Sequence, residues 1–207
     1  PGTGRQMQMS LFMDSMQMLL DDLRREQERL FGEQNPEMKH EIKRHIDKII
    51  DDIIRAKLTK DNNTAGLKKY EESLKQKTKP YFLWKLEFAK VFRENGGFDI
   101  VIGNPPYIGF HNVPNKEYFN NNYFVANGKY DFYVLFIERG LQLVRQNGFL
   151  SYICPSYFYI RNYGKNTRKL LLDTTTIKFI ADFKDFQIFD SALTYTCIFG
   201  AEKTITE

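Results

Sequence analysis

FDIVIGNPPY, residues 98–107, joins an apolar run rich in β-branched residues to a loop that holds an amide, two prolines and an aromatic ring. The run from Asp99 to Gly103 predicts a strand, and the loop follows its carboxyl end. In open α/β sheets, ligands bind just outside the carboxyl ends of the strands. A fixed carbonyl, an amide and a flat ring at that place suit a planar, hydrogen-bonding substrate such as a nucleobase. We therefore expect the chemistry of the protein at this loop.

Beyond this loop, the sequence alternates between helical and strand patterns. Apolar spacing predicts one helix from Tyr130 to Gln146, which Asn147-Gly148 ends, and another from Asn166 to Leu172. Short apolar runs predict further strands over Phe149 to Cys154, Ile177 to Phe183 and Thr194 to Phe199. Strands separated by helices form right-handed crossovers, so we expect an α/β sheet of about four strands that is mostly parallel. Since no clear helix joins the last two strands, an antiparallel final pair stays open.

The residues before position 80 carry a different pattern, typical of amphipathic helices. Apolar side chains recur every three or four positions from Phe12 to Leu30, and again from Ile42 to Ala56. Asn35-Pro36-Glu37 between them supplies an N-cap, a first-turn proline and an acid that suits the helix dipole. Helices joined by so short a loop form an antiparallel hairpin. We predict a helical hairpin and a short third helix over residues 1–80, and an α/β unit over residues 81–207.

Charge and cysteine content exclude some classes of protein but do not identify a function. The 207 residues carry a net charge of +4 and have a pI near 8.9, which permits a polyanionic partner but does not require one. Cys154 and Cys197 lie in apolar runs, which indicates buried thiols in a reducing compartment rather than a disulfide or metal framework. The sequence has no run long and apolar enough to span a membrane. We expect a cytoplasmic protein with no metal and no membrane partner.

The loop after residue 103 has the groups needed to activate an exocyclic amine. The lone pair of such a nitrogen is delocalised into its ring, so acceptors aimed at both N–H bonds favour a tetrahedral, nucleophilic nitrogen. The side-chain oxygen of Asn104 and the carbonyl of Pro105 are the candidate acceptors, and Pro105 with Pro106 stiffens the loop. Tyr107 is the candidate stacking surface, and such stacking is worth about 1–3 kcal/mol per base. The alternative is a proline-stiffened turn in which Tyr107 only packs.

These residues resemble motif IV of the amino-group methyltransferases that use S-adenosylmethionine, and specifically the adenine-N6 DNA methyltransferases. The wider segment from Lys85 to Tyr107 is similar to the large restriction-modification and phage-defence enzymes related to Eco57I and TaqI. Later segments resemble that family in the same order, namely Gln146 to Pro155, Arg168 to Leu172 and Phe186 to Thr196. The resemblance implies the C-terminal half of a Rossmann-like methyltransferase sheet, preceded by a helical hairpin insertion.

The resemblance also implies which residues hold a flipped adenine. Phe189 matches the aromatic residue that makes the second contact with the base, and Phe186 is the reserve candidate. Simple packing between strands stays an equal alternative for either ring. The basic side chains of the neighbouring loops are candidate phosphate contacts, with ordinary solvated charge as the alternative for each. These side chains are Lys129, Arg161, Lys165 and Arg168.

The cofactor-binding motif of that family has no counterpart in this sequence. Family members bind S-adenosylmethionine with a glycine-rich turn after their first strand, whereas helical patterns occupy the positions before residue 98 here. Pro1-Gly2-Thr3-Gly4 follows no strand and is not such a turn. We expect a fragment of a longer enzyme, inactive by itself, whose cofactor-binding residues lie mostly upstream. The expected partners are double-stranded DNA with a flipped adenine and the other domains of the parent chain.

Two other functions stay open at this point. Enzymes that methylate a glutamine side-chain amide in release factors carry the same loop, because an amide is also a planar NH₂ group. Those enzymes are small and lack both the hairpin and the aromatic segment from Phe186 to Thr196. The remaining alternative is a helical or DNA-binding scaffold without catalytic activity.

Overall fold

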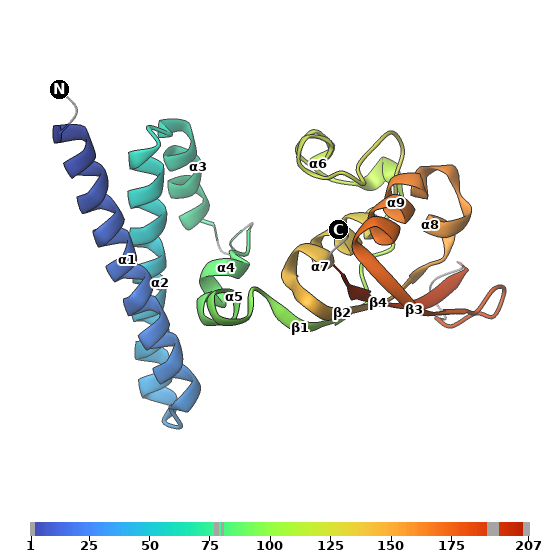
Figure 1. Ribbon diagram of the computed structural model, residues 1–207, viewed down its shortest axis with the longest axis horizontal. Coiled ribbons are helices and arrows are strands. Elements are labelled where there is room, and N and C mark those ends of the chain that lie inside the picture. The colour runs from blue at the N-terminus through green and yellow to red at the C-terminus, as the bar shows by residue number, and fades with distance from the viewer. Residues whose placement is uncertain (1–2, 77–78, 80, 190–194, 205–207) are drawn as a thin grey trace. The chain divides into compact units, whose positions relative to one another are not determined.

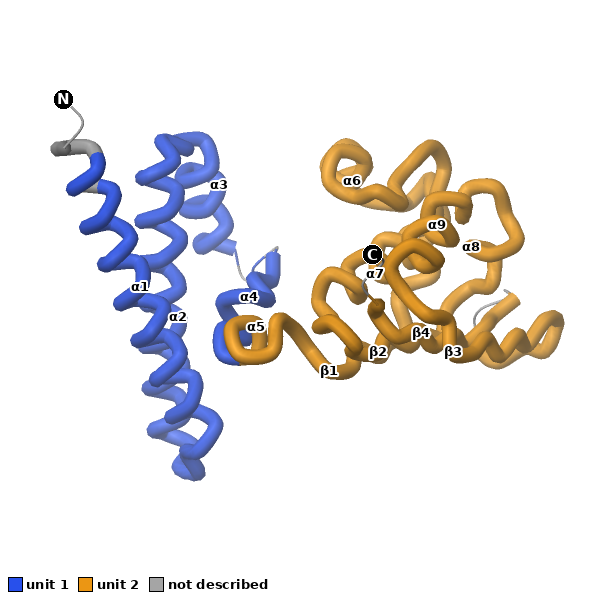
Figure 2. Tube along the Cα trace, viewed as in Figure 1, with its two compact units in different colours: residues 1–90 blue, residues 91–207 orange. Residues whose placement is uncertain are grey.

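The structure is a computed structural model that describes residues 3–76, 79, 81–189 and 195–204. The chain forms two compact units, the first ending at Lys90 and the second beginning at Val91 (Figure 2). Each unit is built around its own cluster of buried apolar side chains. Within the described residues, no helix is both long and apolar enough to cross a membrane.

The first unit is the predicted helical hairpin. Helix α1 (Thr3–Gly32) runs antiparallel to α2 (Pro36–Lys60), and α3 (Thr64–Leu74) packs against α2 (Figure 1). The N-cap prediction is confirmed, since the side chain of Asn35 accepts a hydrogen bond of 2.9 Å from the backbone N–H of Glu37. The buried residues lie at helical spacing and include Leu23, Ile42, Ile46, Ile49 and Ile53. Two short helices follow, α4 (Trp84–Glu87) and α5 (Ala89–Asn95).

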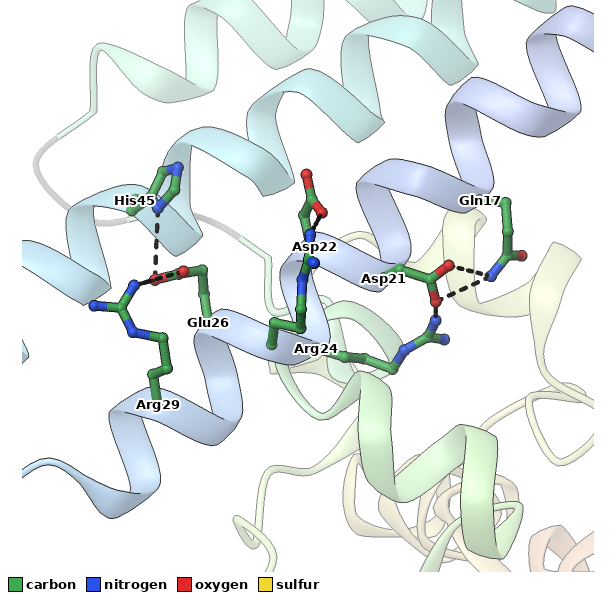
Figure 3. Close-up of polar contacts among 8 residues, drawn as sticks. Gln17, Asp21, Asp22, Arg24, Glu26, Arg29 and His45 are labelled. Atoms are coloured by element: carbon green, nitrogen blue, oxygen red, sulfur yellow. Dashed lines mark hydrogen bonds and ion pairs between the residues drawn. The ribbon is translucent and has the colours of Figure 1, made fainter.

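Ion pairs lie along α1 and between α1 and α2 (Figure 3). Asp21 pairs with Arg24 one turn along α1, and Glu26 pairs with Arg29 at 2.8 Å. Glu26 also lies 3.5 Å from Nδ1 of His45, which connects α1 to α2 (Figure 3). Pairs at this spacing contribute a few tenths of a kcal/mol each, roughly, to helix stability. These charges therefore support the hairpin itself.

The second unit contains a four-stranded sheet with the order β1-β2-β4-β3. The strands are β1 (Phe98–Gly103), β2 (Val144–Pro155), β3 (Thr175–Asp182) and β4 (Thr196–Lys203). β1 pairs with β2 in parallel, whereas β4 pairs antiparallel with both β2 and β3. Strands β1, β2 and β3 therefore run in one direction and β4 runs against them. This arrangement confirms the predicted α/β class and shows that the final pair, which the sequence left open, is antiparallel. The sheet is mixed rather than mostly parallel, because β4 pairs antiparallel with both of its neighbours.

The junction between α7 (Tyr133–Leu143) and β2 differs from the sequence prediction. The helix was predicted to continue to Gln146, but β2 already begins at Val144. The ammonium group of Lys203 donates to the carbonyl of Leu141, in the last turn of α7, at 2.7 Å and to that of Val144, the first residue of β2, at 2.9 Å. Asn147, at φ 59°, lies inside β2 instead of in a connection between helix and strand.

Helices cover one side of this sheet (Figure 1). Helix α7 packs on β2, and α9 (Lys165–Thr174) packs on β3 and on α7. Helix α7 lies close to β2, because a Cβ placed on Gly140 of the helix would lie 2.6 Å from Cδ1 of Leu150 on the strand. The core between these layers contains Tyr133, Ile137, Leu150 and Phe199, each fully buried. The connections carry η1 (Phe110–Asn112), α6 (Lys116–Asn122), α8 (Tyr157–Ile160) and η2 (Asn162–Gly164).

Candidate functional site

The sheet topology gathers several loops at one edge. Because β1, β2 and β3 run in the same direction, their carboxyl ends meet there, and β4 begins at the same edge. Backbone hydrogen bonds join the loops: the N–H of Ser156 donates to Tyr195 at 2.9 Å, and the N–H of Phe183 donates to Thr196 at 3.0 Å. This is the edge at which open α/β sheets bind ligands, and it holds the loop after Gly103.

The loop after β1 presents unpaired acceptors. Asn104 and Pro106 are exposed, whereas Pro105 between them is buried and anchors the loop. Among the residues that the structure describes, none donates a hydrogen bond to the side chain of Asn104 or to the carbonyl of Pro105. The side-chain oxygen of Asn104 is therefore free to accept from a ligand that carries N–H groups, and the carbonyl of Pro105 has no competing donor among the described residues.

Tyr107 is held against the end of β2. Its hydroxyl donates a hydrogen bond of 3.3 Å to the carbonyl of Ile153, and its ring is half-buried. Burial raises the pKa of Tyr107 to about 12, so the phenol stays neutral at ordinary pH. The ring thus has a fixed orientation beside the acceptors of Asn104 and Pro105.

In the structure the ring of Phe189 contacts the ring of Tyr107, whereas Phe186 is exposed to solvent. The ring centroids of Tyr107 and Phe189 are 6.2 Å apart with an angle of 72° between the planes, an edge-to-face contact. Phe189 is half-buried, whereas Phe186 is 70% exposed. Of the two phenylalanines predicted from the sequence, Phe189 is therefore the one in contact with the loop after β1.

The basic side chains predicted to contact phosphates lie in the second unit, Lys129 and Arg161 on loops and Lys165 and Arg168 in the first turn of α9. Lys129, Arg161 and Lys165 are all exposed. The guanidinium of Arg161 lies 5.3 Å from the ring centroid of Tyr157, which limits its orientations without covering its donors. Arg168 has another role, because its Nη1 donates to the carbonyls of Phe158 and Arg161 at 2.8 and 2.9 Å. It braces the loop that carries Arg161.

Two carboxylates of this region were missed by the sequence analysis. Glu138 on α7 is 7% exposed and accepts hydrogen bonds from the backbone N–H groups of Phe124 at 3.2 Å and Val125 at 3.0 Å. Asp131, just before α7, accepts a hydrogen bond of 2.6 Å from the hydroxyl of Tyr163. The sequence does contain a signal for Glu138, because it is an acid within the apolar run of α7. A carboxylate buried at such a position requires hydrogen-bond partners.

The two cysteines pack in the core. Cys154 on β2 lies directly opposite Cys197 on β4, and both are fully buried and free. A hydrogen bond with Cys197, together with burial, raises the pKa of Cys154, so its thiol stays neutral. Within the described part of the chain, no group of three or more His, Cys, Asp or Glu side chains is placed to hold a metal ion.

Comparison with known proteins connects this geometry to a family. The model of the Eco57I restriction-modification methylase family matches residues 6–189. The chain is 34% identical over 114 residues to the type II restriction enzyme and methyltransferase RM.Eco57I of Escherichia coli, which covers 53% of the chain and 11% of that protein. It is 36% identical over 107 residues to the type II methyltransferase M.AccI of Acinetobacter calcoaceticus, covering 49% of the chain and 20% of that protein.

A third relative, the type II methyltransferase M.BstVI of Geobacillus stearothermophilus, is 29% identical over 116 residues, or 55% of the chain and 20% of that protein. The chain thus spans between about a tenth and a fifth of these relatives. The family match includes both the helical hairpin and the loop after β1. The chain belongs to the Eco57I restriction-modification methylase family.

Proposed function

We propose that the second unit carries the target-base site of an adenine-N6 DNA methyltransferase in a restriction-modification system. The observation that carries this proposal is the juxtaposition of unpaired acceptors, on Asn104 and Pro105, with the ring pair of Tyr107 and Phe189. An aromatic amine needs both features. Its N–H bonds require acceptors, and its ring requires an apolar surface.

In this proposal the protein acts by positioning the amine. The side-chain oxygen of Asn104 and the carbonyl of Pro105 accept the two N–H bonds of the exocyclic nitrogen, so its lone pair turns away from the ring system. Tyr107 stacks on the base, and Phe189 contacts it from a second side. Pre-aimed acceptors on a proline-stiffened loop do not have to reorganise as the reaction proceeds. The proton that leaves the nitrogen after methylation passes to solvent.

S-adenosylmethionine supplies the methyl group in this proposal. The described residues include no glycine-rich turn between a first strand and a helix, since helices α1 to α5 precede β1. We therefore place most cofactor contacts outside this chain and assign none to its residues.

DNA is the proposed partner, and the adenine has to leave the duplex to reach the loop after β1. Lys129 and Arg161, on loops of the same unit, and Lys165, at the start of α9, are exposed and would contact the phosphates beside the flipped nucleotide. Such contacts position DNA without reading its sequence.

Glutamine methylation uses the same loop chemistry, and the ring pair argues against it. The amide of a glutamine side chain has no aromatic face to contact both Tyr107 and Phe189, which lie 6.2 Å apart between centroids. A purine ring does have such a face.

Product analysis tests the proposed function. The intact methyltransferase that contains this chain is incubated with S-adenosylmethionine and unmodified DNA, and the digested nucleosides are analysed by mass spectrometry. We expect N6-methyladenine as the product. Methylation of cytosine instead, or methylation of a glutamine-containing peptide with DNA left unmodified, would contradict the proposal.

A further inference from the structure

A partly buried hydrogen-bond network lies between two loops of the second unit. The hydroxyl of Tyr163, on η2, donates to Oδ2 of Asp131 at 2.6 Å. The same hydroxyl is 3.1 Å from the hydroxyl of Tyr133, which is fully buried at the start of α7. The three residues thus connect the segment before α7, the core of α7 and the loop after β2.

Asp131 is fixed beside the loop that follows β1. The backbone N–H of Phe132, its neighbour, donates to the carbonyl of Ile108 at 2.8 Å. A Cβ placed on Gly109 would lie 3.8 Å from Oδ1 of Asp131, so this carboxylate is in contact range of the chain just beyond Tyr107. Asp131 therefore lies beside the residues that directly follow the loop carrying Asn104 and Tyr107.

Tyr163 is fixed in the loop that carries the basic side chains. It lies between Arg161 and Lys165 in the chain, and its neighbour Gly164 packs directly on the backbone of α8. A Cβ placed on Gly164 would lie 1.8 Å from the carbonyl oxygen of Phe158, so this turn has little freedom to shift. The loop is also braced by Arg168, which donates to the carbonyl of Arg161 at 2.9 Å.

The phenol of Tyr163 keeps its proton, and so can donate a hydrogen bond, throughout the pH range in which enzymes work. Burial, followed by the hydrogen bond to Asp131, raises its pKa far above the ordinary tyrosine value. Burial likewise raises the pKa of Tyr133. An O–H to carboxylate hydrogen bond of this kind is stronger than one between neutral groups.

We propose that Asp131 and Tyr163 form a positioning pair that holds the Asn104–Tyr107 loop in register with the Arg161–Lys165 loop. The inference rests on the proposed function, in which the first loop holds the target base and the second contacts the flanking phosphates. Neither residue touches the reacting atoms. The pair keeps the base at the distance and angle needed for methyl transfer once the DNA backbone is bound, and its loss lowers turnover more than DNA binding.

Steady-state kinetics on the intact methyltransferase test the pair. Tyr163→Phe removes the donor and keeps the ring, and we expect kcat to fall about 10-fold or more, with KM for DNA changing less than about threefold. Asp131→Asn retains an acceptor oxygen and should keep more activity than Asp131→Ala. The Tyr163→Phe and Asp131→Ala changes should not add in the double variant, because each removes the same hydrogen bond.

Two controls separate positioning from stability. Tyr152→Phe removes a hydroxyl from another buried tyrosine of the same unit, outside the network, and should leave kcat unchanged. Fluorescence of 2-aminopurine at the target position should show a flipped base that is less well held in Tyr163→Phe, measured at a temperature at which both proteins are fully folded. A kcat of Tyr163→Phe or Asp131→Ala equal to that of the wild type would overturn the inference. So would a loss of kcat matched by Tyr152→Phe.

The outcomes distinguish the inference from the function on which it rests. A wild-type enzyme that methylates no adenine overturns the proposed function and, with it, the pair. A wild-type enzyme that methylates adenine normally, together with fully active Tyr163→Phe and Asp131→Ala variants, overturns the pair alone.

Discussion

Replacing Glu138 by alanine should destabilise the second unit and loosen the segment that precedes α7. The carboxylate is 7% exposed and accepts hydrogen bonds from two backbone N–H groups, those of Phe124 at 3.2 Å and Val125 at 3.0 Å. Val125 is fully buried, so its N–H would have no substitute partner in the variant. Phe124 is 49% exposed, so its N–H can turn to water.

The cost follows from that difference. One buried donor left unpaired costs about 1–3 kcal/mol, and losing a hydrogen bond to a charged group in a partly exposed place adds about 1 kcal/mol more. We therefore expect the free energy of unfolding to fall by about 2–4 kcal/mol. In a domain of this size each kcal/mol lowers the melting temperature by about 3–5 °C, so the expected drop is near 10 °C.

Urea unfolding followed by near-ultraviolet circular dichroism of the tyrosines measures this change. Native-state hydrogen exchange of the Val125 amide should accelerate in the variant, since its acceptor is gone. Glu117→Ala on α6 is the matched control, because that carboxylate is exposed. If Glu138→Ala lost less than about 1 kcal/mol, or no more than the control, the assigned role of the carboxylate would be wrong.

Three further changes have defined outcomes. Gly164→Ala should lower the stability of the second unit and distort the Arg161–Lys165 loop, since the new methyl group would meet the carbonyl of Phe158; broadened amide NMR signals confined to this loop would report it. Tyr107 has a folded pKa of about 12, above the ordinary value near 10, so its contribution to stability is complete below pH 10 and lost as pH rises through 12. Unfolding measured from pH 8 to 12 should therefore show a smaller loss in Tyr107→Phe than in the wild type. Lys203→Met should fray the end of α7, measurable as faster amide exchange there, because the carbonyls of Leu141 and Val144 lose their charged donor.

The sequence predicted those parts of the fold that depend on local patterns. The hairpin follows from apolar spacing and from Asn35, whose cap geometry is visible in three consecutive residues. Strand β1 and its loop follow from a short apolar run that ends at Asn104. The start of β2 was misplaced because Val144 fits a helical stripe and a buried strand equally well. The ammonium group of Lys203, distant in sequence, donates to two carbonyls at that point, and no local pattern shows this contact.

The part of the candidate site that depends on a local sequence pattern was predictable too. Asn104 to Tyr107 are contiguous, so their chemistry is apparent without a structure. The contact of Tyr107 with Phe189 spans more than eighty residues, and a family resemblance, not a local pattern, pointed to it. Nothing local indicates that Tyr163 donates to Asp131, because only the packing of η2 beside α7 brings the two together.

The central claim is that Asn104 holds the amine that is methylated. Its most direct test compares methyl transfer by the intact enzyme and its Asn104→Ala variant, using labelled S-adenosylmethionine and saturating DNA. Asn121→Ala, on the exposed surface of α6, is the matched control. We expect Asn104→Ala to lose at least about 100-fold in kcat while its DNA affinity stays close to that of the wild type, because two aimed acceptors become one. A variant that turned over like the wild type would contradict the account.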